Sequence, residues 1–236
     1  MKAAALIGVL VMAHGGDPAW NEVVEEAVAP LRAKHPTALA YGMADSDALQ
    51  HAVYDLERRG VRKIAVVRLF LSGDSFLTRT EKILGLKPGA GYKAELAVGN
   101  MKDIVMVAPS QESVLLVAHG VGDDKVDRRW RDAMLPAVAA VKKAAPFRKV
   151  TAVTLRDDWP EAHAKAVAEI KAFVAEAKGD GGRALVVPYR LYGFGPQSSS
   201  LEGLDIVTDD KGLLPDPSVA AWLVAESDRL IKEAGW

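Results

Sequence analysis

The stretch VLVMAHG at residues 9–15 decides the fold class, because its ending returns as LLVAHG at residues 115–120. Each stretch is a run of aliphatic residues, which predicts a strand buried on both faces, and His-Gly follows where such a strand leaves its sheet. Strands of this kind are typical of parallel sheets that helices cover on both sides. We therefore expect an α/β fold in which His14 and His119 follow equivalent strands.

The similarity between the two halves continues beyond His-Gly. Trp20 aligns with Trp130 on two amphipathic helical patterns, and Gly73 aligns with Gly193 after two apolar runs that predict strands. The sequence therefore predicts two similar lobes, each with a parallel sheet flanked by helices.

The lobe boundary is expected near residues 108–113, where Pro, Ser and Gln interrupt the apolar pattern. We assign residues 1–110 to the first lobe and residues 111–236 to the second, with a cleft between them. The last helical pattern, which begins at Asp216 and Pro217, is expected to pack on the second lobe. Ligands of parallel sheets collect beyond the carboxyl ends of the strands, so the site is expected there.

Composition favours a small-molecule partner. The chain has 236 residues, half of them hydrophobic, and its 30 Lys and Arg are balanced by 31 Asp and Glu, so it has no overall basic field for nucleic acid. It has no Cys, which excludes thiolate metal ligands. The chain has neither G-x-G-x-x-G after a strand nor G-x-x-x-x-G-K-[ST], the two glycine-rich motifs that bind nucleotide phosphates, so no nucleotide cofactor is expected. No G-x-S-x-G motif supports a hydrolase.

The first thirteen residues have two interpretations. MKAAALIGVLVMA resembles a short signal peptide, but its likeness to the stretch before His119 favours a strand at residues 4–13. A cytoplasmic protein is therefore expected, with a periplasmic location as the alternative if a signal peptide is removed. No apolar run reaches the ~18 residues of a membrane span.

The order of these elements, with an apolar strand ending in His-Gly and a third strand of the type VVRLFLSGDS at residues 66–75, resembles the class II chelatases. The resemblance is to the sirohydrochlorin cobaltochelatase and ferrochelatase group in its two-lobed form, and it covers nearly the whole chain. It implies insertion of a divalent metal ion (Co, Fe or Ni) into a tetrapyrrole without ATP. It also implies that His14, and His119 at the equivalent place, bind the metal and act in catalysis. Neutral imidazole suits both tasks, because it binds such metals and accepts protons near neutral pH.

The chain departs from the family pattern at two places. The family has a second histidine two residues after the glycine of the third strand, where this chain has Ser75 and Gly195. An acidic residue at the end of the second strand is also missing, and Met43 stands there in the first lobe. A non-catalytic protein that binds a tetrapyrrole or a metal on the same scaffold is therefore the alternative function, and a protein for an unrelated small ligand is a third.

Further candidate ligand-binding residues lie in the third strand or at strand ends. Arg68 is a candidate partner for tetrapyrrole carboxylates, and Asp74 could replace the missing acidic residue. Met43 is either a ligand of a soft metal or part of the hydrophobic core. His51 and His163, at equivalent helical positions, are expected to be surface or packing histidines. The predicted tetrapyrrole-binding residues are Met43, Arg68, Ser72, Gly73, Asp74, Ser75 and Gly193.

Overall fold

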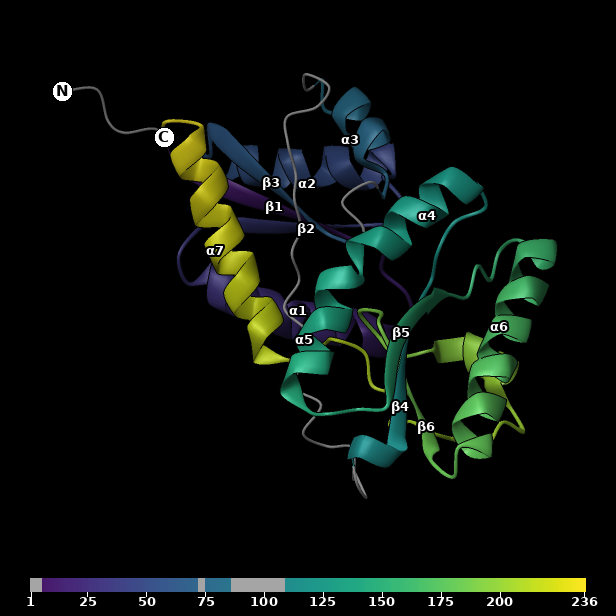
Figure 1. The fold of residues 1–236 in the computed structure, drawn as a ribbon. Coiled ribbons are helices and arrows are strands. Elements are labelled where there is room, and N and C mark those ends of the chain that lie inside the picture. Colours follow the sequence, from purple (N-terminus) through teal and green to yellow (C-terminus); the bar gives the residue numbers. More distant parts are fainter. Residues whose placement is uncertain (1–5, 72–74, 86–108) are drawn as a thin grey trace. The chain divides into compact units, whose positions relative to one another are not determined.

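The computed structural model describes residues 6–71, 75–85 and 109–236 (Figure 1). The chain divides into two compact units, the first made of residues 1–97 and 214–236 and the second of residues 98–213. Each unit contains a parallel sheet flanked by helices, which confirms the predicted α/β class.

The sheet of the first unit has the strand order β2-β1-β3. Its strands are β1 (Ile7–Ala13), β2 (Thr37–Tyr41) and β3 (Lys63–Leu69), all parallel. The central strand β1 is buried from Gly8 onward, as the aliphatic run predicted. Because Ala13 pairs with both Tyr41 and Leu69, the three strands end at the same edge of the sheet.

Aspartate caps begin the first two helices of this unit. Asp17 accepts a hydrogen bond from the Trp20 N–H at the start of α1 (Pro18–Arg32), and Asp45 accepts one from Ala48 at the start of α2 (Ser46–Arg58). Such caps satisfy backbone donors that the first helical turn leaves free. The helix α2 packs on the face of β1 that carries Leu10 and Met12.

The last helix belongs to the first unit. The helix α7 (Pro217–Glu233) contacts α1 and β3, and it buries Val219 and Leu223. The expectation that this helix packs on the second lobe is therefore wrong. An amphipathic pattern shows which helix face is apolar, but not which sheet that face covers. The short α3 (Leu77–Ile83) completes the helices described in this unit.

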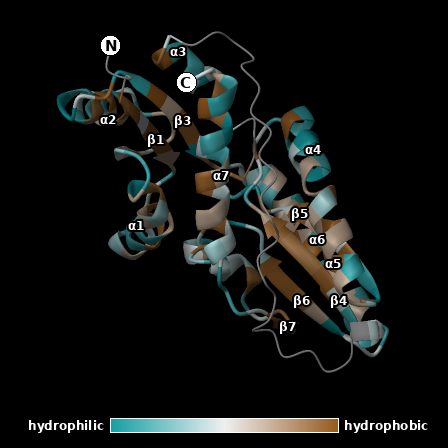
Figure 2. Cartoon of the chain, turned by 90° about the vertical axis from the view of Figure 1, so that its left-hand side faces the viewer, coloured by the Kyte–Doolittle hydropathy of each residue, from teal (hydrophilic) through white to brown (hydrophobic). Residues whose placement is uncertain are grey.

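The sheet of the second unit has the order β5-β4-β6-β7 and is also parallel. Figure 2 shows the hydrophobic colour along much of β4 and β6, and all seven residues of the central strand β4 are buried. Its strands are β4 (Glu112–Ala118), β5 (Lys149–Thr154), β6 (Arg183–Pro188) and β7 (Ile206–Val207).

The helical pattern after His119 forms two helices, α4 (Asp124–Ala133) and α5 (Leu135–Ala144), where the sequence predicted one. Pro136 lies in the first turn of α5 and has no N–H to donate to the preceding turn, so the helix is interrupted there. The other helices are α6 (Pro160–Gly179) and the 3-10 helices η2 (Pro109–Gln111) and η3 (Gly195–Leu201). Among the helices described, none has both the length and the apolar character needed to cross a membrane.

Candidate functional site

His14 and His119 occupy equivalent places in their own units. Each directly follows the central strand of its sheet, β1 or β4, at the carboxyl edge. The main chain just beyond the neighbouring strand bonds to each of them, since the N–H of Gly42 donates to the carbonyl oxygen of His14 and the N–H of Arg156 donates to that of His119. The predicted equivalence of the two histidines is confirmed.

The glycine after each histidine is required by the backbone. Gly15 and Gly120 have φ values of +73° and +82°, which side chains rarely adopt. A Cβ at Gly15 would lie 2.9 Å from the Cβ of Tyr41, and one at Gly120 would lie 2.6 Å from the Cβ of Thr154. Because Tyr41 and Thr154 both end the adjacent strand, the same steric constraint applies in both units. The glycine of the repeat is thus required by the backbone, and the histidine is the residue whose side chain can bind a metal or accept a proton.

Tryptophan side chains lie beside both histidines. The rings of Trp20 and His14 are stacked, with centroids 5.6 Å apart, and Trp130 lies 6.4 Å from His119 in a tilted arrangement. Trp159 approaches His119 as well, at 6.1 Å. The aligned residues Trp20 and Trp130 therefore each lie next to the histidine of their own unit.

The two histidines differ in their polar partners. His14 is exposed, and its Nδ1 lies 2.9 Å from the carbonyl oxygen of Gly15. Within the described residues, His14 forms no ion pair, whereas His119 lies between two carboxylates. The second unit therefore holds the more developed site.

His119, Asp157 and Arg190 form a compact cluster at the carboxyl ends of β4, β5 and β6. The Nδ1 of His119 lies 3.1 Å from Oδ2 of Asp157, and Nη2 of Arg190 lies 2.7 Å from the same oxygen and 2.8 Å from Nδ1. The Asp157 side chain is only 7% exposed, so it is held in place rather than freely solvated. The Nε2 of His119 lies 3.3 Å from Oδ2 of the exposed Asp158.

The Asp157 carboxyl group is ionised at neutral pH. Burial raises its pKa, but the hydrogen bond with His119 and the charge and hydrogen bond of Arg190 together lower the pKa below its ordinary value. A negative charge is therefore fixed next to the imidazole of His119.

The cluster allows two tautomers of His119, because guanidinium only donates and carboxylate only accepts. If Nδ1 accepts from Arg190, Nε2 carries the proton and faces Asp158. If Nδ1 donates to Asp157, Nε2 presents a lone pair, and Arg190 donates to Asp157 but not to Nδ1. This second arrangement is the one in which a carboxylate orients a histidine for proton transfer or metal binding.

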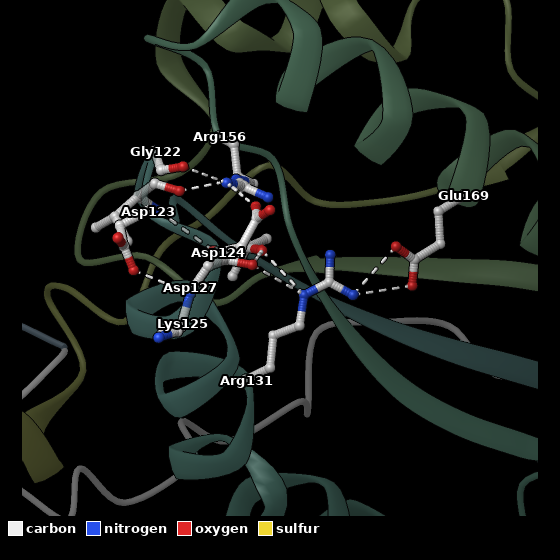
Figure 3. Close-up of polar contacts among 10 residues, drawn as sticks. Gly122, Asp123, Asp124, Lys125, Asp127, Arg131, Arg156 and Glu169 are labelled. Atoms are coloured by element: carbon white, nitrogen blue, oxygen red, sulfur yellow. Dashed lines mark hydrogen bonds and ion pairs between the residues drawn. The ribbon is translucent and has the colours of Figure 1, made fainter.

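A polar network fixes the loop that follows His119 (Figure 3). Arg156 donates to the carbonyl oxygens of Val121 and Gly122 at 2.7 and 2.6 Å, and to the carboxylate of Asp124 at 2.7 Å. Buried Asp127 accepts from the hydroxyl of Thr154 at 2.9 Å and from the N–H of Val121 at 3.3 Å. The loop is thus attached to the end of β5.

Arg131 extends this network toward α6. Its Nε donates to the Thr154 hydroxyl at 3.1 Å, and its Nη1 lies 3.1 Å from both carboxylate oxygens of Glu169 (Figure 3). The loop, the end of β5, α4 and α6 are therefore connected around the candidate site.

The predicted tetrapyrrole-binding residues have varied surroundings. Met43 is 54% exposed at the carboxyl end of β2, so the interpretation of Met43 as core filler is wrong. Arg68 is 3% exposed, and its guanidinium donates to the carbonyl oxygen of Ser75. That contact joins β3 to the segment after it and directs the guanidinium into the protein. Ser72, Gly73 and Asp74 lie outside the described residues.

Gly193 has a backbone role. It has a φ of +42°, and a Cβ there would lie 2.2 Å from the carbonyl oxygen of Asp210. The next residue, Phe194, donates its N–H to the Asp210 carboxylate at 2.8 Å. Gly193 therefore permits a close approach of two segments of the second unit.

No group of three or more His, Asp or Glu side chains that could hold a metal ion is found in the described parts of the chain. His119 Nε2 and Asp158 Oδ2 are two potential donors at one place, which is fewer than a structural metal site uses.

Sequence reasoning missed Asp157 and Arg190. Aspartate is a common residue at helix starts, but the N-cap of α6 is Trp159, and the Asp157 side chain bonds to His119 and Arg190. Arg190 was not singled out because it lies in the mostly apolar segment that follows β6. Their places after β5 and β6 were the available signal, because the carboxyl ends of adjacent parallel strands meet.

Comparison with known proteins assigns no family. No protein-family model matches the chain, and no curated protein sequence matches it. Among solved structures, the chain is similar to the "Crystal structure of a galactofuranose binding protein", with a TM-score of 0.30 and 12% identity. That likeness covers 98% of this chain and 72% of the other. At this TM-score it supports no conclusion about fold or ligand.

Proposed function

We propose that the chain is a metallochelatase of the sirohydrochlorin type, which inserts a divalent metal ion (Co, Fe or Ni) into a tetrapyrrole. The observation that supports this proposal is His119 at the end of a central parallel strand, with its Nδ1 next to the buried carboxylate of Asp157. The resemblance of the strand-His-Gly order to the class II chelatases supplies the substrate class.

The chemistry of insertion matches what this cluster offers. Two protons must leave the pyrrole nitrogens, and a metal ion must be held loosely enough to be released into the ring. An imidazole whose Nδ1 donates to Asp157 can accept a proton at Nε2, and the neighbouring anion stabilises the imidazolium that results. His119 is therefore the proposed base.

The donor set suits a metal that passes through as a substrate. His119 Nε2 and Asp158 Oδ2 are 3.3 Å apart, and two protein donors bind an ion more weakly than the four of a structural site. His14 offers an equivalent imidazole in the first unit, next to Trp20 and the end of β2.

The alternative is a protein that binds a tetrapyrrole or metal on this scaffold without insertion. Two features favour that alternative for the first unit. His14 is exposed and forms no ion pair among the described residues, and Ser75 stands where the family has its second histidine. A location in the cytoplasm belongs to the proposal as well. Residues 7–13 form the central strand β1, which favours the strand interpretation of this stretch.

The test mixes purified protein with sirohydrochlorin and Co²⁺ or Fe²⁺ and follows the visible spectrum against the same mixture without protein. We expect accelerated insertion, and His119→Ala should slow it by about 100-fold if His119 is the base. Asp157→Asn should also slow it, because the amide cannot stabilise the imidazolium.

His51→Ala is the matched control, because His51 lies exposed on α2. A rate equal to that of the protein-free mixture, with a spectral shift showing a bound tetrapyrrole, would establish the non-catalytic alternative. Equal acceleration by the original chain and His119→Ala would exclude His119 as the base.

A further inference from the structure

A second histidine in the same unit has a nucleophile beside it. The Nε2 of His163 on α6 lies 3.1 Å from Oγ of Ser200 in η3. The His163 side chain is 26% exposed and has two hydrogen-bonding partners. The proposed metal insertion does not use this pair.

The tautomer of neutral His163 is fixed by the main chain. Its Nδ1 lies 2.8 Å from the carbonyl oxygen of Leu155, and a carbonyl oxygen only accepts hydrogen bonds. Nδ1 must therefore carry the proton, which leaves the lone pair on Nε2. The Ser200 hydroxyl then donates to Nε2, which is the arrangement that a histidine acting as a base toward serine requires.

A buried carboxylate oxygen faces the same ring. Asp157 Oδ1 lies 3.8 Å from Nδ1 of His163, and within the described part of the chain this oxygen is buried without a hydrogen-bond partner. Arg190 bonds to the other carboxylate oxygen, Oδ2. The unsatisfied Oδ1 therefore stabilises the imidazolium that forms when Nε2 takes a proton.

Neighbouring serines lack this arrangement. Ser199 is exposed, and its hydroxyl donates to the carbonyl oxygen of Pro196 at 3.1 Å. Ser200 is half-buried and keeps some solvent access. Ser200 has an imidazole partner and Ser199 bonds to a main-chain carbonyl oxygen instead, which makes Ser199 a matched control.

We propose that Ser200 is an activated nucleophile with His163 as its general base, reactive toward carboxylic esters and phosphonyl electrophiles. In an ester reaction, Oγ bonds to the carbonyl carbon while its proton passes to His163 Nε2. The carbon–oxygen bond of the ester then breaks, and the leaving alcohol takes that proton. Water releases the acyl group by the reverse transfer, so no oxidant, reductant or metal is needed.

The experiment exposes the full chain to a fluorophosphonate probe and locates the label by peptide mass spectrometry. Here Oγ–P forms, P–F breaks, and fluoride leaves as the proton passes through His163 to solvent. We expect the label on Ser200, loss of labelling in Ser200→Ala, and retention in Ser199→Ala. His163→Gln should slow labelling by about 100-fold, the scale of general-base assistance.

A second readout is the initial burst of p-nitrophenol from p-nitrophenyl acetate, which should disappear in Ser200→Ala. Far-UV circular dichroism of each variant shows whether it is folded. An unlabelled folded protein, equal labelling of Ser199 and Ser200, or labelling unchanged by His163→Gln would each overturn the proposal. None of these readouts involves metal insertion, so this proposal and the proposed function fail independently.

Discussion

At the residue scale, the glycine of each His-Gly pair is fixed by two separate constraints. Gly120→Ala would place a Cβ at positive φ and 2.6 Å from Thr154, and we expect it to lower the free energy of unfolding by about 3 kcal/mol or more. Urea denaturation measures this change.

Gly60→Ala isolates the first constraint. Gly60 has a φ of +83°, but a Cβ added there would have no described atom within 4 Å, so only backbone strain of about 1–2 kcal/mol is expected. Equal losses in Gly60→Ala and Gly120→Ala would show that contact with the end of β5 does not matter.

Asp157 should make the stability of the second unit sensitive to acid. Its pKa is lowered in the folded protein, so its ionised form stabilises the fold above the unfolded pKa, near 3.8. That stabilisation is lost as the pH falls through the folded pKa. We expect Asp157→Asn to be destabilising at pH 7 and the difference from the original chain to shrink below about pH 4.

Urea denaturation at several pH values measures this difference, with the exposed Asp158→Asn as control. A difference between the original chain and Asp157→Asn that grows toward acid would contradict the assigned direction.

At the element scale, the network around α4 depends on one buried carboxylate. Asp127→Ala removes the acceptor for Thr154 and Val121 and the ion-pair partner of Arg131 at 3.3 Å. We expect the free energy of unfolding to fall by about 3 kcal/mol, because buried polar groups lose their partners.

Glu169→Ala is the comparison, since it removes the exposed partner of the same arginine, and it should lower stability by under about 1 kcal/mol. If the two variants were equally stable, the buried position of Asp127 would have no energetic importance.

The elements themselves were predictable to different degrees. Aliphatic runs predicted β1 and β4, and Asp216 with Pro217 predicted the start of α7, because these signals are local. The two-residue strand β7 was not predicted, since so short a strand has no periodicity. The role of Asp157 was missed because the same residue type serves both as a helix cap and as a histidine partner.

At the scale of the whole molecule, the last helix should stabilise the first unit. Leu223 is fully buried in α7, which packs on α1 and β3. We expect Leu223→Ala to destabilise this unit by about 2–5 kcal/mol through the cavity it leaves. Hydrogen exchange followed by mass spectrometry should show faster exchange in α1 and β3.

The strands β4 and β6 are the internal reference for that measurement, because they belong to the second unit. Faster exchange in β4 and β6 with unchanged exchange in β3 would contradict the assignment of α7.

The position of α7 in the chain also sets an order of assembly during translation. The second unit is encoded by one uninterrupted segment, residues 98–213, whereas the first unit needs residues from both sides of that segment. All of the second unit has therefore been synthesised before the ribosome adds α7. Domains ordinarily fold in the order in which they are made. Here the unit whose synthesis starts first can be completed only last, and until then α1 and β3 lack the helix that packs against them.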